Sequence, residues 1–498
     1  MNRIVISNGI VFTGEEILSS ATVVIEGDTI AHVISGDDSA RNMPALGDGN
    51  ENRPSNKTSH TNGASPSNRT SPTYAASPAN QTSPTNGAGR TNRASQVANE
   101  ADTIYVDASG RLVTPGLVNA HTHIYSALAR GIALKDPPPT NFVQNLERLW
   151  WRLDRALTMD EIRLSARLHA VECLKSGVTT IFDHHASQRA IRGSLSTIAQ
   201  ALGELGLRAC LCFEVSDREG AAAVAAGVEE NSAFIRDTLD AEGTMLRARF
   251  GLHASLTLSD ATLEACTKAV DSCSVGFHIH VAEDKSDQTD AESRYSLRVI
   301  ERLARFGVLG PQTICVHGIH LDEREIDILA ASSAWLVHCP ESNMNNAVGC
   351  TSLQELKSAG VRLALGTDGF TANMMREALS AHLLQNHLTG QPGAGYNTVP
   401  DLLFSANAAL ARETFGVDIG LLCEGSPADL VVWDYRPPTP LTMNSLWGHI
   451  LFGLVNARAE DVIISGRHVL QNGVPVSCNE ADLARHCSLA AQDLWDRF

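Results

Sequence analysis

The 498-residue chain lacks the features that mark membrane-spanning, secreted or nucleic-acid-binding proteins. No apolar run is long enough to span a bilayer. The N-terminus alternates apolar and polar residues without a basic start or a continuous apolar core, so it predicts a β-strand instead of a signal peptide. Lysine and arginine number 39 against 56 acidic residues, and the net charge of −17 repels phosphate backbones and anionic lipids. We therefore expect neither nucleic acid nor a membrane as a partner.

Paired cysteines are also missing. The eleven cysteines are odd in number, are scattered through apolar segments and form no CxxC motif. Reduced thiols packed in a core are therefore expected instead of a disulfide framework, and this favours a cytoplasmic protein. With 43% hydrophobic and 19% charged residues, the composition is that of an ordinary globular chain that can bury a large core.

Large apolar residues are nearly absent from one segment, residues 36–100. It is rich in Asn, Ser, Thr, Pro and Gly, and it repeats with a period of twelve in copies that start at Asn56, Asn68, Asn80 and Asn92. Such a composition cannot bury enough surface to offset the entropy of ordering, so we expect a disordered insert. Strand patterns flank it on both sides, which places it in a loop, where long insertions cost little.

Both ends of the chain carry short strand patterns of similar length and style. We expect residues 1–35 and 101–115 to form one part of a small β domain, and residues 417–478 to form the other part. The predicted architecture of this domain is a composite β-sandwich, with the rest of the chain inserted between its parts. The last residues, 479–498, have the pattern of a terminal helix.

Between these ends, residues 116–416 alternate short β-branched or apolar runs with amphipathic helices. One helix begins with the capping box Thr158-x-x-Glu161 and stops at Gly177. Strands that alternate with helices in this way predict an α/β fold, a (β/α)8 barrel of the TIM type. The eight strand candidates are LVNAHTH, VTTIFDHH, RACLCFEV, RARFGLHAS, VGFHIHVAE, QTICVHG, SAWLVHCP and RLALGTDG.

Histidines gather at the carboxyl ends of these predicted strands, and the eighth strand ends in Asp368. In a TIM-type barrel those ends meet on the face that carries the active site. His121 and His123 lie on the same side of a strand, where both can reach one ion, although an HxH pair alone is weak evidence for a metal. The strand-end histidines are His121, His123, His184, His185, His253, His278, His280, His317 and His338.

Two later motifs add to the HxH pair. In HIHVAE, His280 precedes Glu283 by three residues, which could set a metal ligand beside a carboxylate that does not bind the metal. His278 shares the face of His280 and is an alternative ligand. In GTDG, glycines flank Asp368 and permit a close approach. Three imidazoles and one carboxylate suit Zn²⁺ or Fe²⁺, and such an ion lowers the pKa of a bound water to about 7, so the set indicates a hydrolytic site.

Seven short motifs resemble, in sequence and in order, those of the amidohydrolase superfamily, in its branch of cytosine, guanine and adenosine-type deaminases and chlorohydrolases. The resemblance covers nearly the whole chain outside the insert. The finer run from Ile124 to Asp154 is similar to SsnA-type aminohydrolases. The motifs are PGLVNAHTH, SGVTT, HVAE, CVHGIH, HCPESN, GTDG and GSPADLVVWD.

The resemblance implies one divalent metal ion, Zn²⁺ first and Fe²⁺ as an alternative, because the fourth strand lacks the lysine or glutamate of binuclear members. It implies that Glu283 carries a proton to the substrate nitrogen and that His317 contacts the hydrolytic water or the developing charge. Asp368 is a second acceptor for the proton of the water. The implied metal ligands are His121, His123, His280 and Asp368.

The expected activity is the hydrolytic deamination of a purine-like, pyrimidine-like or related nitrogen heterocycle, with release of ammonia. Hydrolysis of a cyclic amide and displacement of a ring halide at the same site are alternatives. A catalytically silent assembly protein is another, but it predicts lost ligands, whereas all the implied ligands are present. We also expect a homo-oligomer, a dimer in its simplest form.

Four further residues are candidates for substrate binding. His253 lies where the family places a histidine, with a hydrogen-bonded residue at the rim as an equal alternative. His185 is one of two adjacent histidines of which one faces the pocket. Arg130 could meet an anionic or carbonyl group, or else form a surface ion pair. Asn343, in HCPESN, is expected to line the pocket.

Overall fold

The structure is a computed structural model that describes residues 3–36, 103–240, 243–271, 273 and 275–498. The predicted disordered insert, residues 36–100, lies outside the described residues except for its first position. Within the described ranges, no helix is both long and apolar enough to cross a membrane.

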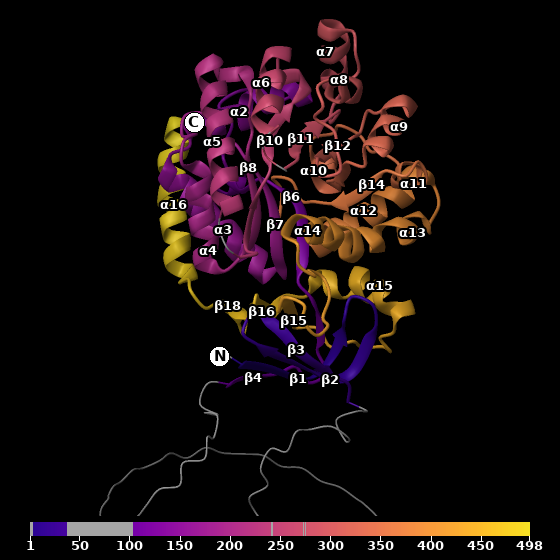
Figure 1. Cartoon of the computed structure of the whole chain (residues 1–498). Coiled ribbons are helices and arrows are strands. Elements are labelled where there is room, and N and C mark those ends of the chain that lie inside the picture. Colours follow the sequence, from indigo (N-terminus) through magenta and orange to yellow (C-terminus); the bar gives the residue numbers. More distant parts are fainter. Residues whose placement is uncertain (1–2, 37–102, 241–242, 272, 274) are drawn as a thin grey trace, which may run out of the picture.

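Strands from both ends of the chain pair in one nine-stranded sheet (Figure 1). These strands are β1 (Arg3–Phe12), β2 (Ile17–Glu26), β3 (Thr29–Ile34), β4 (Thr103–Asp107), β5 (Leu112–Pro115), β15 (Leu430–Trp433), β16 (Ala459–Ile464), β17 (Arg467–Gln471) and β18 (Val474–Pro475). Their order is β18–β17–β16–β15–β5–β1–β2–β3, with β4 beside β1. β15 pairs antiparallel with β5, so the two ends of the chain are hydrogen-bonded directly. Because the strands are connected as a single sheet, the predicted two-sheet sandwich is not confirmed.

The remaining strands run parallel in two sheets, with helices on the outside (Figure 1). These strands are β6 (Leu117–Thr122), β7 (Val178–His185), β8 (Arg208–Phe213), β9 (Leu246–Ala248), β10 (Phe250–Ala254), β11 (Phe277–Val281), β12 (Ile314–His317), β13 (Trp335–His338) and β14 (Arg362–Leu365). One sheet has the order β6–β7–β8–β9 and the other the order β10–β11–β12–β13–β14. Every predicted barrel strand is present, and the fourth is divided into β9 and β10.

The two parallel sheets meet at two seams. Thr122 and Asp368 form an isolated parallel bridge at one seam, and Val215 and Leu252 form another at the second. The division of the fourth strand at Arg249 creates the second seam, because β9 pairs with β8 whereas β10 pairs with β11. The fold is therefore α/β and of the TIM type, but the expected closed eight-stranded ladder is replaced by two sheets joined by single bridges.

The α-helices of the described residues lie mostly outside the two parallel sheets (Figure 1). They are α1 (Phe142–Asn145), α2 (Trp151–Ala156), α3 (Met159–Lys175), α4 (Ser194–Leu205), α5 (Ala221–Asp240), α6 (Asp260–Val270), α7 (Lys285–Tyr295), α8 (Val299–Arg305), α9 (Glu323–Ser332), α10 (Pro340–Asn345), α11 (Leu353–Ser358), α12 (Met374–Thr389), α13 (Ala394–Pro400), α14 (Asn407–Phe415), α15 (Met443–Phe452) and α16 (Glu480–Arg497). α3 begins at the predicted capping box, in which Thr158 and Glu161 satisfy each other's backbone N–H groups. The C-terminal helix α16 packs against α3.

An apolar cluster fills the interior of the barrel below the site. Val118, Phe182 and Val316 point inward from three strands and pack against Leu410 and Phe415 of α14. This cluster closes one end of the barrel, so the polar strand ends are collected at the other end, where a substrate can reach them.

Candidate active site and metal centre

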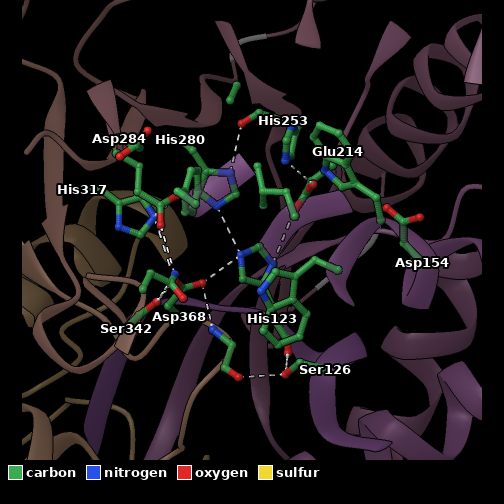
Figure 2. A pocket seen from close by; sticks show the side chains of 18 of the residues that line it. His123, Ser126, Asp154, Glu214, His253, His280, Asp284, His317, Ser342 and Asp368 are labelled. Atoms are coloured by element: carbon green, nitrogen blue, oxygen red, sulfur yellow. Dashed lines mark hydrogen bonds and ion pairs between the residues drawn. The ribbon is translucent and has the colours of Figure 1, made fainter. Parts of the chain in front are cut away.

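The carboxyl ends of the parallel strands surround a chamber (Figure 2). His123 at the end of β6, His280 on β11, His317 on β12 and Asp368 after β14 all line it, together with Glu283. The structure thus brings together the residues that the sequence predicted as metal ligands and proton carriers. His121, the remaining predicted ligand, lies wholly buried beneath the chamber.

Asp368 is held against β6 by the backbone. The N–H groups of Thr367 and Asp368 both donate to the carbonyl oxygen of His121, each at 3.0 Å. Gly366 makes this approach possible, because a Cβ at that position would lie only 2.8 Å from the backbone nitrogen of His121. The close approach expected from the glycines of GTDG is therefore present at Gly366.

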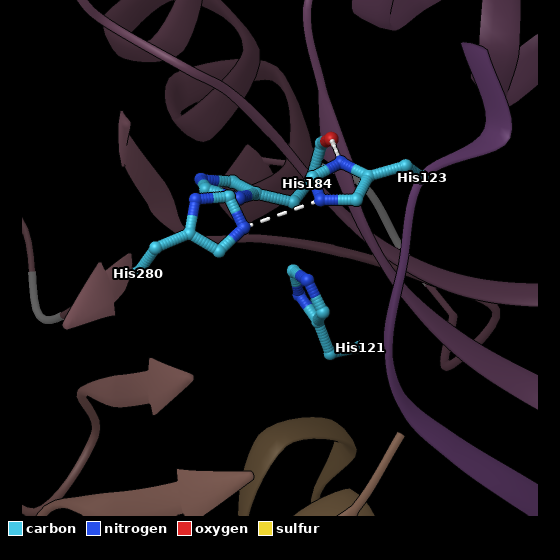
Figure 3. Close-up of side chains that lie close together, drawn as sticks. All are labelled: His121, His123, His184 and His280. Carbon is cyan, nitrogen blue, oxygen red and sulfur yellow. Dashed lines mark hydrogen bonds between the residues drawn. The ribbon is translucent and has the colours of Figure 1, made fainter. Parts of the chain in front are cut away.

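Nitrogen and oxygen atoms with metal-ligand character converge at this point. Oδ1 of Asp368 lies 3.0 Å from Nε2 of His123 and 3.5 Å from Nε2 of His121. Nε2 of His123 and Nε2 of His280 face each other at 3.2 Å (Figure 3). Nε2 of His121 is buried and has no hydrogen-bond partner. A buried polar atom without a partner is costly, so the cluster is suited to a cation.

Backbone carbonyls fix the tautomers of two of these histidines. Nδ1 of His123 lies 2.6 Å from the carbonyl oxygen of His184, and Nδ1 of His280 lies 3.0 Å from that of His253. A carbonyl can only accept, so each Nδ1 donates and each neutral ring carries its lone pair on Nε2. Two lone pairs that face each other at 3.2 Å repel unless a proton or a metal ion lies between them. The pair therefore fits a divalent ion.

Burial and charge set the protonation states of the cluster, and they act in opposite senses on different histidines. Burial lowers the pKa of His121 to about 3 and that of His280 well below its usual value, so both stay neutral. Burial also opposes charge on His123, but the Asp368 carboxylate outweighs burial and raises the pKa of His123 to about 9, so a metal ion that binds Nε2 must displace a proton from it. For Asp368 burial favours the neutral acid, yet hydrogen bonds from His121 and His123 hold its pKa well below the usual range. The carboxylate is therefore ionised.

The described residues form two overlapping groups with the spacing of metal ligands. The predicted ligands are distributed over both groups, and His184 joins one of them although the sequence did not predict it as a ligand. His278 belongs to neither group. Its Nε2 lies 2.9 Å from Nδ1 of His121, where it orients that ring. The groups are His121, His123, His184 and His280, and His121, His317 and Asp368.

Glu283 and His317 form the wall beside this cluster. Nε2 of His317 lies 3.4 Å from Oε2 of Glu283, and the Asn346 amide donates to Oε1 of Glu283 at 3.3 Å. Burial raises the pKa of Glu283 to about 7, a value that suits a group that both takes and gives a proton. Asn343 lies behind His317, 2.8 Å from Nδ1, so it orients His317 and does not line the chamber as predicted.

Three residues at the site have a left-handed backbone. The φ angles are 46° at Ala282, 75° at His317 and 55° at Asp368. Residues with a side chain adopt this region rarely, and such strain persists where the surrounding structure enforces it, often at functional sites. Here it turns the ends of β11 and β12 and the segment after β14 so that Glu283, His317 and Asp368 face one chamber.

The other predicted substrate-binding residues divide into two kinds. His253 lines the chamber, and its Nδ1 lies 2.7 Å from the hydroxyl of Thr257, so its position agrees with both alternatives. His185 lies behind the wall, where its Nε2 is 2.9 Å from the hydroxyl of Ser187. Arg130 forms a two-pronged ion pair with Glu172, and 65% of its side chain is exposed. The structure therefore places neither His185 nor Arg130 in the chamber. Arg130 forms the surface ion pair that was the alternative to substrate binding.

Several chamber residues were not predicted. Glu214, 2% exposed, follows β8 and lies 3.4 Å from Nδ1 of His123, and burial raises its pKa to about 7. Its place at the end of a predicted strand was a usable signal. Asp154 and Arg218 pair at 2.6 Å and line the chamber with Trp151. They come from α2 and from η4 (Asp217–Glu219), outside the strands, where the sequence pattern carries no such signal.

Comparison with known proteins places the chain in a family. The model of the Amidohydrolase family matches residues 112–469. A 5-methylthioadenosine/S-adenosylhomocysteine deaminase from Pelotomaculum thermopropionicum is 31% identical over 401 residues, 79% of this chain and 88% of the relative. A 5'-deoxyadenosine deaminase from Methanothermobacter thermautotrophicus is 30% identical over 379 residues, 75% of this chain and 85% of the relative.

A solved structure has the same fold. The adenosine deaminase from Xanthomonas campestris, with bound zinc, superposes with a TM-score of 0.75 at 21% identity and covers 99% of each chain. At this identity the likeness shows the fold, whereas the family follows from the sequence matches. The chain thus belongs to the amidohydrolase family, in its deaminase and chlorohydrolase branch, and is a metal-dependent hydrolase that acts on carbon–nitrogen bonds.

Proposed function

We propose that this hydrolase uses one Zn²⁺ ion to deaminate a purine-like heterocycle, with pyrimidine-like and related rings as the wider class. The observation that carries the proposal is that Nε2 of His123 lies 3.2 Å from Nε2 of His280 and 3.0 Å from Oδ1 of Asp368. The names of the relatives, which are deaminases of adenosine-type compounds, support a purine-like ring. The zinc in the Xanthomonas enzyme supports zinc over iron.

We assign the metal to the four residues predicted from the sequence. When bound, the ion supplies a nucleophile at neutral pH, because it lowers the pKa of the hydrolytic water. His184 is left out of the set because its ring stacks flat on His278, with 4.6 Å between centroids and 9° between planes. The assigned ligands are His121, His123, His280 and Asp368.

Glu283 and His317 then move the protons. Water adds to the ring carbon that bears the amino group, and Glu283 or Asp368 takes its proton. Glu283 gives a proton to the neighbouring ring nitrogen. The hydroxyl proton of the tetrahedral carbon then passes through Asp368 to the amino group, so that the C–N bond breaks, ammonia leaves and the C=O bond forms. Asn343 fixes the Nδ1 side of His317, so Nε2 faces the chamber and, when protonated, donates to the oxygen that develops on the ring.

Metal content and ammonia release, measured on the same preparation, test the proposal. The purified full chain is expected to hold one zinc per chain and to release ammonia from at least one member of a panel of aminopurines, aminopyrimidines and aminotriazines. Chloride release from chlorotriazines, measured in parallel, distinguishes a chlorohydrolase. A reconstituted protein that holds zinc but releases neither product contradicts the proposal and favours a silent relative.

The division of the chain is also a proposal. We infer that residues 116–416 form the catalytic unit, with residues 1–35, 101–115 and 417–478 as a small β unit and 479–498 as its helical tail. The hydrogen bonding of β5 to β15 supports this division. We further propose a cytosolic dimer, and sedimentation of the purified full chain tests its oligomeric state.

A further inference from the structure

A second cavity adjoins the chamber at the histidine–aspartate cluster. It has a volume of about 160 Å³, and His123, Ser126 and Asp368 line both cavities. This volume holds several water molecules or an ammonia molecule. The two cavities therefore meet where the proposed reaction releases its leaving group.

The second cavity has an outer end of its own. Arg130, after η2 (Ile124–Ala129), and Glu172 of α3 line this cavity but not the chamber, and their side chains are 65% and 29% exposed. Nη1 and Nη2 of Arg130 donate to the two carboxylate oxygens of Glu172 at 2.7 and 3.1 Å. A small molecule that passes this ion pair moves between the cluster and the solvent without crossing the chamber.

The chamber itself is shaped for the ring of a substrate. Its apolar side chains include Phe142, Leu146 and Trp151, none of which lines the second cavity. A heterocycle bound among them lies between the cluster and the opening of the chamber. Ammonia that forms beside Asp368 would have to pass the ring product in order to leave by that opening.

The wall of the second cavity suits a small amine or its cation. Burial lowers the pKa of His169 to about 4, so this lining residue is neutral. The hydroxyl of Thr122 donates to the carbonyl oxygen of Asp368 at 3.2 Å and lies 3.3 Å from Nε2 of His169, so Nε2 donates and Nδ1 keeps the lone pair. Arg130 is the one arginine or lysine among the described residues of the wall, and Glu172 neutralises it.

We propose that the second cavity is the exit of ammonia, and that the Glu172 carboxylate receives it as ammonium ion in place of Arg130. Ammonia takes the additional proton from solvent water at the outer end. The heterocycle enters and leaves through the chamber. The inference rests on the proposed deaminase function and deepens it, because it gives the two products separate routes out of the site.

Filling the second cavity tests the route. Ala127 of η2 lines this cavity and not the chamber. In the zinc-loaded full chain, Ala127→Phe is expected to lower the steady-state kcat by ~10-fold and to change the rate of the first turnover by less than ~3-fold, because ammonia is retained after the chemical step. Rapid quenching of the ring product measures both rates. Thr371→Trp fills the same cavity from the segment after β14 if the first variant fails to fold.

An alanine elsewhere supplies the control. Ala199 of α4 is half-buried and lines neither cavity. Ala199→Phe is therefore expected to leave both rates within ~3-fold of the wild type. An unchanged steady-state kcat in the cavity-filling variants overturns the proposal, and so does an equal loss in both rates, which shows that filling the cavity disturbs the chemical step.

The two halves of the ion pair are expected to act in opposite directions. Ammonium chloride inhibits turnover by occupying the exit, with sodium chloride used to hold the ionic strength constant. Glu172→Gln is expected to weaken this inhibition by ~3-fold or more, because the carboxylate is lost, and Arg130→Met to strengthen it by ~3-fold or more, because the competing cation is lost. A merely structural ion pair gives the same change in both variants, and that result overturns the role of Glu172.

An ion pair on the same helix is the matched control. Arg167 of α3 lies 3.3 Å from Glu204 of α4, and neither residue lines a cavity of the site. Arg167→Met and Glu204→Gln are expected to leave the inhibition by ammonium within ~2-fold of the wild type.

Thiol accessibility distinguishes failure of this inference from failure of the proposed function. If no substrate releases ammonia, the deaminase proposal fails, but the route can still be tested with Ser126→Cys, which places a thiol where the two cavities meet. Methyl methanethiosulfonate is expected to modify this cysteine at least ~5-fold more slowly when Thr371→Trp is also present, as measured by mass spectrometry. Equal rates show that small molecules reach the cluster through the chamber, and they overturn the inference.

Discussion

A single backbone carbonyl decides which nitrogen of a histidine faces the cluster, and this gives a prediction for the metal ligands. His280 donates from Nδ1 to the carbonyl of His253, so its Nε2 is left for the ion, whereas the ring of His184 stacks on His278. His280→Asn is therefore expected to lose the metal, and His184→Asn to keep about one ion per chain. Metal analysis of the two purified variants checks this prediction. If only His184→Asn loses the metal, His184 is the ligand in place of His280.

The carboxyl group of Glu283 predicts a pH dependence. Burial raises its pKa from the usual 4.5 to about 7, so below that pH it becomes neutral and cannot take a proton. A bound cation favours the carboxylate, so kcat/KM is expected to fall as the pH drops, with a midpoint at or below about 7. Steady-state measurements of kcat/KM between pH 5 and pH 9 check this acid-side decrease. A kcat/KM that rises toward acid pH contradicts the prediction.

Removal of the same carboxylate should remove the proton transfer. Glu283→Gln keeps the shape of the side chain but cannot carry a proton, so kcat is expected to fall by ~10²- to 10⁴-fold with metal content unchanged. Glu292→Gln, whose surface carboxylate pairs with Arg298, is the matched control and is expected to behave as wild type. Turnover that persists in Glu283→Gln assigns the proton transfer to Asp368 instead.

Among single residues, the sequence predicted those whose place is set by the end of a strand. It did not predict those whose place is set by tertiary contacts. His123, His280 and Asp368 follow from strand positions and short motifs. Glu214 occupies a comparable strand end and was overlooked. Arg218 is held at the chamber by an ion pair with Asp154 of another element, and Arg130 forms its ion pair with Glu172 at the surface. Local sequence does not predict either partner.

At the scale of elements, the capping box of α3 predicts a local contribution to stability. The Thr158 hydroxyl accepts the N–H of Glu161, one of the donors that a helix start leaves unsatisfied. Thr158→Ala is therefore expected to lower the free energy of unfolding by ~1 kcal/mol. Thr197→Ala is the control, because that hydroxyl donates to Gly193 on an exposed turn of α4 and caps nothing. Denaturant titration compares the two, and equal effects would contradict a capping role.

The strands show what periodicity can and cannot predict. Every barrel strand was located by its apolar pattern, but the pattern does not state which neighbour a strand pairs with. The fourth strand therefore appeared continuous in the sequence, whereas β9 and β10 pair with different neighbours on either side of Arg249. The same limit applies to the small β unit. The similar patterns at both ends of the chain indicated that these strands belong together, but they did not indicate that the strands form one sheet.

At the scale of the whole molecule, the proposed metal site lies across a seam. His121 and His123 belong to one parallel sheet, His280 to the other, and Asp368 follows β14 at the bridge to Thr122. A ligand that binds only the folded state stabilises it by RT ln(1 + [L]/Kd), ~2.7 kcal/mol at a free concentration 100 times Kd. Removal of the metal by a chelator is therefore expected to lower the apparent Tm by several degrees, and added zinc to restore it. In His123→Asn the proposed site lacks a central ligand, so the same chelator should leave Tm unchanged; an equal drop in both proteins would show that the stabilising metal binds elsewhere.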